Sequence, residues 1–391
     1  MKKVLIYMKE EDLKPVGGPR GYLYNLKKGL DGLNQKQINF IKAKSIKSRY
    51  HKIYDKLPLI IKQYYREKIK ISSYKKLLDD TTPNKSSYSF EQYEIIHFHS
   101  TTDMYKVKDT LKEYKGKVLL TSHTPKPNHL EIYEDSITEK ERKKYGKYYE
   151  KLNIVDEYAF NRADYIIFPC EEAEEPYYNR WEKYEEIKEK KKDKYRYILT
   201  GIQKCKINTN KEEIRKKYNI PEDAFVISYI GRHNEVKGYD LLKEIGEEIL
   251  NNKNVYILVA GNEGPLYAIK NKKWIEVGWT NDPYSIIASS DLFILPNKET
   301  YFDLVLLEVL SLGVPVLMSQ TGGNKYFNKF DSKGIKYFKN KNEAVEKIKE
   351  IINLDKIELK KIGKNNKKIF EENFTCETFA KNYIELINSL N

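Results

Sequence analysis

The sequence predicts an α/β protein of two domains, each built on a parallel sheet, that face one another across a cleft. The chain has 391 residues, which is longer than one hydrophobic core usually serves. Short runs of β-branched residues recur along it between turn residues, and each is followed by a longer stretch with helical spacing. This alternation is typical of βαβ units, and two series of such units meet near residues 197–202.

Eight of these runs are expected to form buried strands, divided evenly between the two halves of the chain. In the first half they are residues 4–8, 94–99, 117–122 and 165–169. In the second half they are residues 225–231, 255–261, 292–296 and 314–318. We therefore expect a first domain over residues 1–198, a second over 199–372, and a helix within 373–391.

Two charged insertions interrupt the alternation. Residues 41–77 carry 12 Lys or Arg against two acids, and their apolar residues fall near three-or-four spacing. This segment suits an anionic membrane surface, but it equally suits a helix that packs its apolar side on the first domain and leaves its lysines in water. Pro58 favours two short helices over one. The second insertion, residues 180–194, mixes both signs of charge and is expected to be a solvated helix.

The composition of the chain indicates which partners it binds and in which compartment it is located. Lys and Arg number 71 against 57 Asp and Glu, a net charge of +14, which favours acidic partners such as nucleotide phosphates or lipid headgroups. The basic residues follow no recognised nucleic-acid-binding motif, so no nucleic acid is expected. Three widely spaced cysteines indicate a reducing compartment. The apolar start of the chain ends at Lys9 and is expected to be a strand rather than a signal peptide.

The strongest local signal is a strand, a polar loop and a helix over residues 292–313. The helix is expected to begin near Phe302 and to stop at Gly313. Its free N-terminal amides form a natural phosphate site. Glu308 lies within an apolar run one and a half to two turns inside this helix, where an unpaired carboxylate would be costly. It is placed to accept hydrogen bonds from the hydroxyls of a ribose.

A second strand, loop and helix spans residues 225–240. Arg232 follows the strand and Lys237 precedes Gly238, so the loop carries two cations. Two cations in such a loop can neutralise a diphosphate leaving group.

The order of these motifs resembles family 4 of the retaining, GT-B-fold glycosyltransferases. The resemblance is carried in the second half by Gly231-Arg232 with Lys237-Gly238, by Gly261-Asn262-Glu263-Gly264-Pro265, and by residues 304–316 (Leu-Val-Leu-Leu-Glu-Val-Leu-Ser-Leu-Gly-Val-Pro-Val). In the first half it is carried by Gly17-Gly18-Pro19-Arg20-Gly21, by residues 95–100, and by Thr121-Ser122-His123-Thr124-Pro125. It implies two Rossmann-like domains and a last helix that crosses back onto the first domain.

The resemblance also implies roles for single residues. Arg232 and Lys237 would hold the diphosphate of a nucleotide sugar, Glu308 the ribose, and His123 would sit beside the anomeric centre, although a capping or core histidine remains an alternative. Gly17 and Gly18 would let the backbone approach the donor phosphate. Further substrate contacts are expected at Gly261, Glu299, Tyr301, Phe302, Asp303, Leu304 and Val305.

Two residues depart from the family pattern. The family has two glutamates eight positions apart, but eight positions before Glu308 stands Thr300, with Glu299 displaced by one. Either Thr300 replaces the carboxylate that contacts the transferred sugar, or the loop shifts so that Glu299 serves. Asp303 stands where a glycine is common, and its carboxylate could bond a helix-start amide or repel phosphate.

The function implied by the resemblance is the retaining transfer of a sugar from a nucleotide sugar, with a UDP-sugar favoured, to a hydroxyl of a glycan, lipid-linked or protein-linked acceptor. No metal and no cofactor is expected. The location implied is the cytoplasm, at the inner face of the membrane if residues 41–77 bind it. A non-catalytic subunit that assists a partner transferase is the alternative. The glycines of residues 17–21 lack the spacing of a dinucleotide-binding oxidoreductase.

Overall fold

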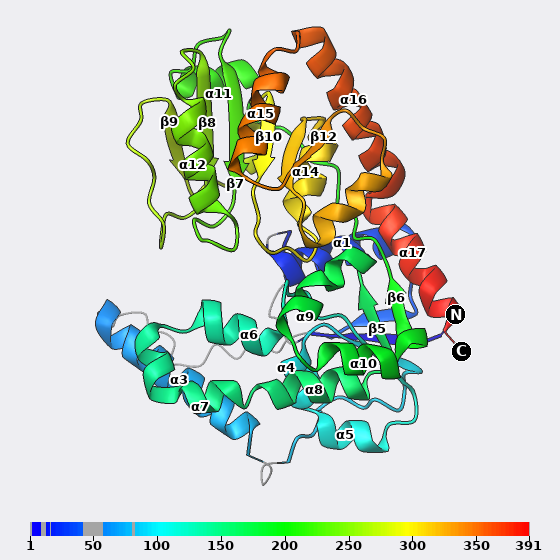
Figure 1. Cartoon of the computed structure of the whole chain (residues 1–391). Helices are drawn as coiled ribbons and strands as arrows, with labels where there is room; N and C mark the ends of the chain where they lie inside the picture. Colours follow the sequence, from blue (N-terminus) through cyan, green and yellow to red (C-terminus); the bar gives the residue numbers. More distant parts are fainter. Residues whose placement is uncertain (1, 9–12, 16, 42–57, 80–82, 391) are drawn as a thin grey trace.

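A computed structural model describes residues 2–8, 13–15, 17–41, 58–79 and 83–390. Within them the chain forms two six-stranded sheets, and all of their strand pairs are parallel (Figure 1). The central strands are buried along their whole length, because helices cover both faces of a parallel sheet. The predicted α/β class with two parallel sheets is confirmed.

The first sheet has the strand order β2-β1-β3-β4-β5-β6. Its strands are β1 (Val4–Tyr7), β2 (Ile38–Phe40), β3 (Ile95–Phe98), β4 (Lys117–Leu120), β5 (Tyr165–Phe168) and β6 (Tyr195–Tyr197). The second sheet has the order β12-β11-β10-β7-β8-β9. Its strands are β7 (Phe225–Ile230), β8 (Val255–Ala260), β9 (Trp274–Gly278), β10 (Leu292–Leu295), β11 (Val316–Ser319) and β12 (Ile335–Phe338).

Helices connect the strands. In the first half they are α1 (Gly18–Gly32), α3 (Leu59–Leu77), α4 (Thr101–Tyr105), α5 (Lys108–Glu113), α6 (Asn128–Glu131), α7 (Glu139–Glu150), α8 (Asn153–Arg162), α9 (Glu175–Arg180) and α10 (Tyr184–Lys190). In the second half they are α11 (Lys211–Lys217), α12 (Tyr239–Ile249), α13 (Pro283–Ala288), α14 (Leu304–Leu312), α15 (Lys341–Ile352), α16 (Lys356–Asn373) and α17 (Cys376–Ser389). Short helical turns cover Ile132–Ser136, Glu171–Glu174, Lys192–Lys194 and Gly322–Lys329.

The C-terminal helix α17 packs on the first sheet's helix α1 (Figure 1). Phe379, Tyr383 and Ile387 are buried in one core with residues of β1 and α1. Gly29 of α1 permits the close approach, since a Cβ there would lie 2.0 Å from the carbonyl oxygen of Cys376. The two ends of the chain therefore lie side by side. The predicted boundary at residues 198/199 lies between β6 and β7 and stays a prediction.

Two expectations need correction. All eight expected strands are present, but β2, β6, β9 and β12 were missed. The expectation that residues 180–194 form only a solvated helix is wrong, because Tyr184 and Ile187 of α10 are buried in the main core. Of the 41–77 insertion, residues 42–57 lie outside the described part, and Pro58 directly precedes the single helix α3. Among the described residues, no helix has the length and apolar character needed to cross a membrane.

Candidate active site

The predicted site residues follow the carboxyl ends of strands in both sheets. In the first sheet, Gly17 follows β1 and His123 follows β4. In the second, Arg232 follows β7 and the loop of residues 296–303 follows β10. β7 and β10 are neighbours although they are distant in sequence, so the strand order reverses between them. Such a switch point is where open parallel sheets bind ligands.

Lys237 and Asp303 join the two loops of the second sheet. The Lys237 Nζ atom lies 2.6 Å from the Asp303 carboxylate, which also accepts hydrogen bonds from Asn297 and from the hydroxyl of Thr300, the latter at 3.1 Å. Gly238 has φ of +66°, and a Cβ there would lie 1.7 Å from the carbonyl oxygen of Pro296. Only glycine allows α12 to begin this close to the end of β10.

Helix α14 begins at Leu304, two residues later than expected, and ends as predicted at Gly313, which has φ of +72°. Asp303 is its N-cap residue but makes no side-chain capping bond, because its carboxylate faces Lys237 instead. The Asp303 side chain therefore caps no first-turn amide of α14, although the Leu306 amide donates to the Asp303 carbonyl oxygen at 3.1 Å. An anion could bind the remaining amides at the start of the helix.

Glu308 is the fifth residue of α14. Burial raises the pKa of its carboxyl to about 7, although a hydrogen bond with Tyr284 partly offsets this rise. A carboxylate with this pKa is half-ionised near neutral pH and remains a strong hydrogen-bond acceptor. Among the described residues, this acid thus bonds Tyr284 and keeps the capacity to accept further hydrogen bonds.

A cluster of three histidines lies at the ends of β3 and β4. His97 Nε2 lies 2.9 Å from the Thr121 hydroxyl and its Nδ1 lies 2.9 Å from the Tyr383 hydroxyl of α17. His99 Nδ1 lies 2.7 Å from His123 Nε2. Burial lowers the pKa of His97 and of His123 to about 3 and that of His99 well below its usual value. All three imidazoles are therefore neutral at physiological pH.

His123 has a left-handed backbone, with φ of +49°, which is strained for a residue with a side chain. This bend turns the ring between Tyr22 of α1, at 4.6 Å between ring centroids, and Tyr301 of the second sheet's loop, at 6.5 Å. The structure thus brings His123 beside a predicted residue from the other half of the chain.

Glu299 and Thr300 face in different directions. Thr300 is 2% exposed and its hydroxyl donates to Asp303. Glu299 instead contacts two cations of the first half, with Arg180 at 2.5 Å and Lys126 at 3.4 Å. Glu134 contacts the same two cations. Four charged residues therefore connect the loop after β10 to the first sheet's helices.

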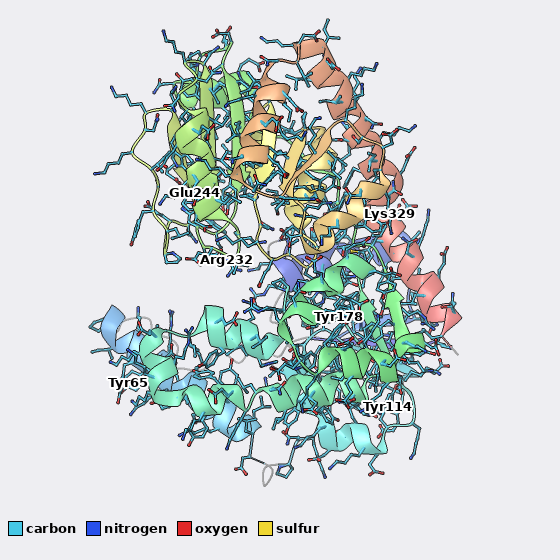
Figure 2. All side chains as sticks on the ribbon, viewed as in Figure 1. Tyr65, Tyr114, Tyr178, Arg232, Glu244 and Lys329 are labelled. Carbon is cyan, nitrogen blue, oxygen red and sulfur yellow. The ribbon has the colours of Figure 1, made fainter. Side chains whose placement is uncertain are left out.

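The predicted site residues Gly17, Gly18, Arg232 and Gly261 make few side-chain contacts of their own. Gly17 has φ of +79°, and a Cβ on Gly17 or Gly18 would meet no atom within 4 Å, so both glycines leave open space beside the start of α1. Arg232 is exposed at the edge of the second half that faces the first (Figure 2). Gly261 has φ of +149° and abuts the Gly231 carbonyl oxygen, which makes it a packing residue between β7 and β8.

Sequence reasoning missed Lys126, Arg180 and His99 as members of this site. Arg180 belonged to the insertion that was interpreted as solvated, and the lysine content of the chain hides Lys126. His99 could have been found, because His-Phe-His at a strand end places two histidines on the same side of the strand.

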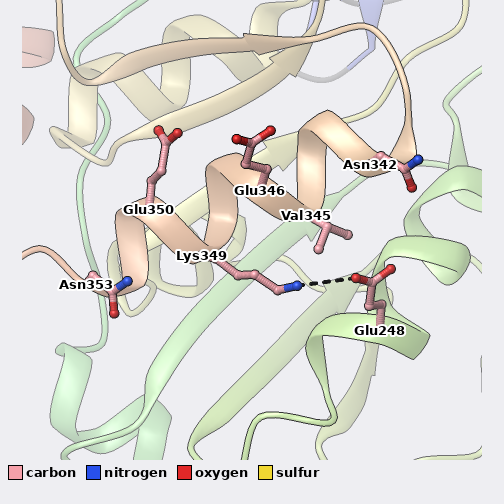
Figure 3. Close-up of a pocket in the computed structure, with 7 residues that line it drawn as sticks. All are labelled: Glu248, Asn342, Val345, Glu346, Lys349, Glu350 and Asn353. Carbon is pink, nitrogen blue, oxygen red and sulfur yellow. Dashed lines mark hydrogen bonds and ion pairs between the residues drawn. The ribbon is translucent and has the colours of Figure 1, made fainter.

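Two other features lie apart from these residues. A shallow groove of about 450 Å³ between α12 and α15 is lined by Glu248 and Lys349, which form an ion pair at 3.3 Å (Figure 3). Glu248 lies at the C-terminal end of α12, whereas Lys237 precedes its N-terminal end. In the described part of the chain, no three His, Cys, Asp or Glu side chains form a group that could hold a metal ion.

The fold and these strand-end residues are those of an α/β protein whose helix starts suit a phosphate-bearing ligand. Residues 210–369, less than half of the chain, match the family model of glycosyl transferases group 1. The match begins at α11 and ends within α16, and it includes Arg232, Lys237 and Glu308.

Curated proteins of similar sequence also carry glycosyltransferase names. The O-antigen biosynthesis glycosyltransferase WclY of Escherichia coli is 25% identical over 203 residues, which are 49% of this chain and 55% of that protein. An Escherichia coli UDP-Gal:α-D-GlcNAc-diphosphoundecaprenol α-1,3-galactosyltransferase is 28% identical over 138 residues, 31% of this chain and 35% of the relative. The chain thus spans about half, or less, of the length of these curated relatives.

Among solved structures, Anabaena HepE in complex with UDP and glucose superposes with a TM-score of 0.62 at 13% identity, covering 100% of both chains. At this identity the likeness concerns the fold alone. The fold is the GT-B arrangement of two parallel-sheet units.

Proposed function

We propose that the protein is a retaining glycosyltransferase of family 4 that moves a sugar from a UDP-sugar to a hydroxyl of a glycan, lipid-linked or protein-linked acceptor. The observation that carries this proposal is the grouping of Lys237, the start of α14 and Glu308 at the switch point of the second sheet. Together they offer a cation and backbone amides for a diphosphate and a carboxylate for a ribose. HepE, which shares the fold, was solved with UDP and with UDP-glucose.

In the proposed reaction, the bond between the anomeric carbon and the diphosphate oxygen breaks while the acceptor oxygen bonds to the same face of that carbon. The acceptor's proton passes to the departing phosphate oxygen. Arg232, Lys237 and the first amides of α14 stabilise the negative charge that develops there, a role that a metal ion performs in other enzymes. His123 and Tyr301 would border the sugar, because they meet between the two sheets.

The decisive experiment measures thermal stabilisation and nucleotide release with UDP-, GDP-, ADP- and CMP-sugars, on wild type and on Glu308→Ala. We expect UDP-sugars to stabilise the wild type, and the wild type to hydrolyse the donor slowly. In Glu308→Ala the hydrolysis rate should fall at least a hundredfold and the thermal stabilisation should be lost. Tyr256→Ala, a change on β8 outside the proposed site, serves as a control for general damage. The absence of binding by every donor would favour the non-catalytic subunit.

The register of the loop after β10 is tested by comparing Thr300→Ala with Glu299→Ala. We expect the larger loss of turnover from Thr300→Ala, because this hydroxyl orients the Asp303 carboxylate that faces Lys237. Steady-state kinetics with the donor found above gives the ranking. The opposite ranking would mean that Glu299 leaves Arg180 and contacts the transferred sugar.

We further propose that α3 lies on an anionic membrane surface beside the acceptor. Ile61, Tyr64, Tyr65 and Ile69 fall on one side of α3 and are each between 41% and 63% exposed, although a helix usually buries such residues. The C-terminal half of α3 packs on α7 through Ile71 and Tyr74. An open hollow of about 520 Å³ on α7 is lined by Glu139, Lys140, Lys143 and Lys144. Exposed apolar side chains among lysines suit acyl chains beneath acidic headgroups.

Sedimentation with phosphatidylglycerol vesicles tests the surface. Lys62→Gln/Arg66→Gln/Lys68→Gln removes three positive charges from α3 and should lower vesicle binding at least tenfold. Lys360→Gln/Lys361→Gln/Lys364→Gln removes the same charge from exposed positions of α16 and should leave binding unchanged. Lys70 is kept, because it pairs with Glu141. Equal binding by both triple variants would remove the membrane proposal.

A further inference from the structure

His99 is a buried histidine whose contacts the proposed reaction does not use. It is 3% exposed and lies at the end of β3. One face packs on His97, at 4.0 Å between ring centroids, and the Tyr22 ring lies 5.6 Å away. Its Nδ1 bonds His123 Nε2 at 2.7 Å. His97 uses both of its own ring nitrogens elsewhere, so the His99–His123 bond is an isolated pair.

The hydrogen-bond partners of the four ring nitrogens show which nitrogen of each histidine carries its proton. Two neutral imidazoles carry one N–H each, so one ring donates and the other accepts. Among the described residues, no polar atom bonds the buried Nε2 of His99. If His99 carried its proton there, a buried N–H would stay without an acceptor, which folded proteins rarely tolerate, whereas an unused ring lone pair is a smaller loss. His99 therefore carries its proton on Nδ1 and donates it to His123.

The consequence falls on His123. Its Nε2 accepts the proton of His99 and cannot carry one of its own, so the single N–H of His123 must be on Nδ1. In the described part of the chain no carboxylate bonds either ring, and burial accounts for the lowered pKa of His123. Without a neighbouring acid, the pair has no reason to take up a second proton.

We propose that His99 is a positioning residue that holds His123 as the Nδ1–H tautomer, so that His123 always offers a hydrogen-bond donor, and never an acceptor, to the bound sugar. This inference rests on the proposed function only for the identity of the ligand. It assigns a preference to the site: a sugar oxygen that accepts a hydrogen bond is selected at this position. An analogue whose hydroxyl there is replaced by hydrogen leaves the donor unpaired and is disfavoured.

Long-range ¹H–¹⁵N correlation of the imidazole nitrogens reads the tautomer directly. The chain contains six histidines, and single His→Gln variants assign their signals. In the wild type without ligand we expect His99 and His123 both to carry the proton on Nδ1. A His123 signal with the proton on Nε2, or on both nitrogens at pH 7, would overturn the proposal whatever the enzyme's activity.

Three variants separate positioning from simple packing. His99→Leu removes the donor, so the His123 signal should shift toward the Nε2–H form. His99→Asn places an amide nitrogen where Nδ1 stood and should keep the wild-type tautomer. Tyr383→Phe removes a hydrogen bond of His97 but leaves the His99–His123 bond, and it should also keep that tautomer. An unchanged His123 signal in His99→Leu contradicts the proposal, and if that variant does not fold, the wild-type and His99→Asn spectra still decide it.

Binding measurements give a second readout. Calorimetry should show that His99→Leu weakens the affinity for the UDP-sugar about tenfold, as for one hydrogen bond, while the affinity for UDP is unchanged because UDP carries no sugar to contact His123. Equal weakening of both ligands would indicate structural damage and count against positioning. A wild type with the expected tautomer that binds no UDP-sugar would refute the proposed function and leave the His99 assignment intact.

Discussion

The two sheets have nearly the same architecture, but the second carries an ion pair and a titrating acid at its strand ends, whereas the first carries a cluster of three neutral histidines. At the second sheet, Lys237 and Asp303 form a charged pair, and Glu308 titrates near neutral pH. At the first sheet, His97, His99 and His123 are buried among tyrosines and are neutral. A shared topology thus provides a charged pair at one set of strand ends and a cluster of neutral histidines at the other, where Lys126 and Arg180 are paired with Glu134 and Glu299.

The difference matches two kinds of ligand group. A diphosphate needs cations and backbone amides, since its charge must be neutralised as the sugar departs. A sugar is uncharged and is recognised by hydrogen bonds, for which neutral imidazoles and hydroxyls suffice. Asp303 occupies the place of an anion beside Lys237, so a donor phosphate would share or displace this carboxylate.

The largest expected effect is the loss of turnover when the positive charge of Lys237 is removed from the strand ends of the second sheet. Lys237→Ala should lower turnover by about 10² to 10⁴-fold, because a cation at a developing phosphate charge contributes several kcal/mol to the transition state. Lys298→Ala is the matched control, since Lys298 lies in the loop after β10 and pairs with Asp240. Comparable losses in both variants would mean that the positive charge acts diffusely, and the contrast between the sheets would weaken.

An intermediate effect is expected on stability from Glu308→Gln. The folded pKa of about 7 lies above the ordinary value of 4.5, so ionisation of Glu308 opposes folding, fully above about pH 7 and not at all below about pH 4.5. The variant should therefore gain about 2–3 kcal/mol of unfolding free energy at pH 8 and little at pH 4.5. Urea denaturation at both values measures this. A gain that is independent of pH would place the carboxylate in water.

The smallest expected effect is the pH dependence of stability that arises from the neutral histidines of the first sheet. His97 and His123 have folded pKa values of about 3 against an ordinary value of 6.5. Their contribution to stability is therefore complete above pH 6.5 and is lost as the pH falls toward 3. Between pH 7 and pH 5 each should cost about 2 kcal/mol of unfolding free energy. His97→Phe should flatten this slope relative to wild type. An unchanged slope would show that His97 takes up its proton as readily in the folded protein as in the unfolded chain.

The sequence predicted the central strands and missed the four that form the sheet edges. β2 and β6 border the first sheet, and β9 and β12 border the second. An edge strand has one neighbour and a more solvated face, so it is short and need not be continuously apolar. Tyr-Arg-Tyr of β6 is an example. The buried strands carried a clear signal because both of their faces are covered.

The candidate site was predicted residue by residue, but the contacts within it were not. Local spacing indicated Lys237 and Glu308, and the family resemblance added His123, but neither showed that Asp303 faces Lys237, 66 positions away. The bond between His97 and Tyr383 spans 286 positions. Such pairs depend on strand order and on how α17 crosses, and no periodicity along the chain encodes either.

The return of α17 to the first sheet sets an order of events during synthesis. β6 is complete at residue 197, but the helix that buries one face of α1 and provides the partner of His97 begins at Cys376. At about 5–20 residues per second, the ribosome needs roughly 10–40 s to add the intervening segment. During that interval the first half emerges with an uncovered apolar face, and it can reach its final packing only after the second half has been made.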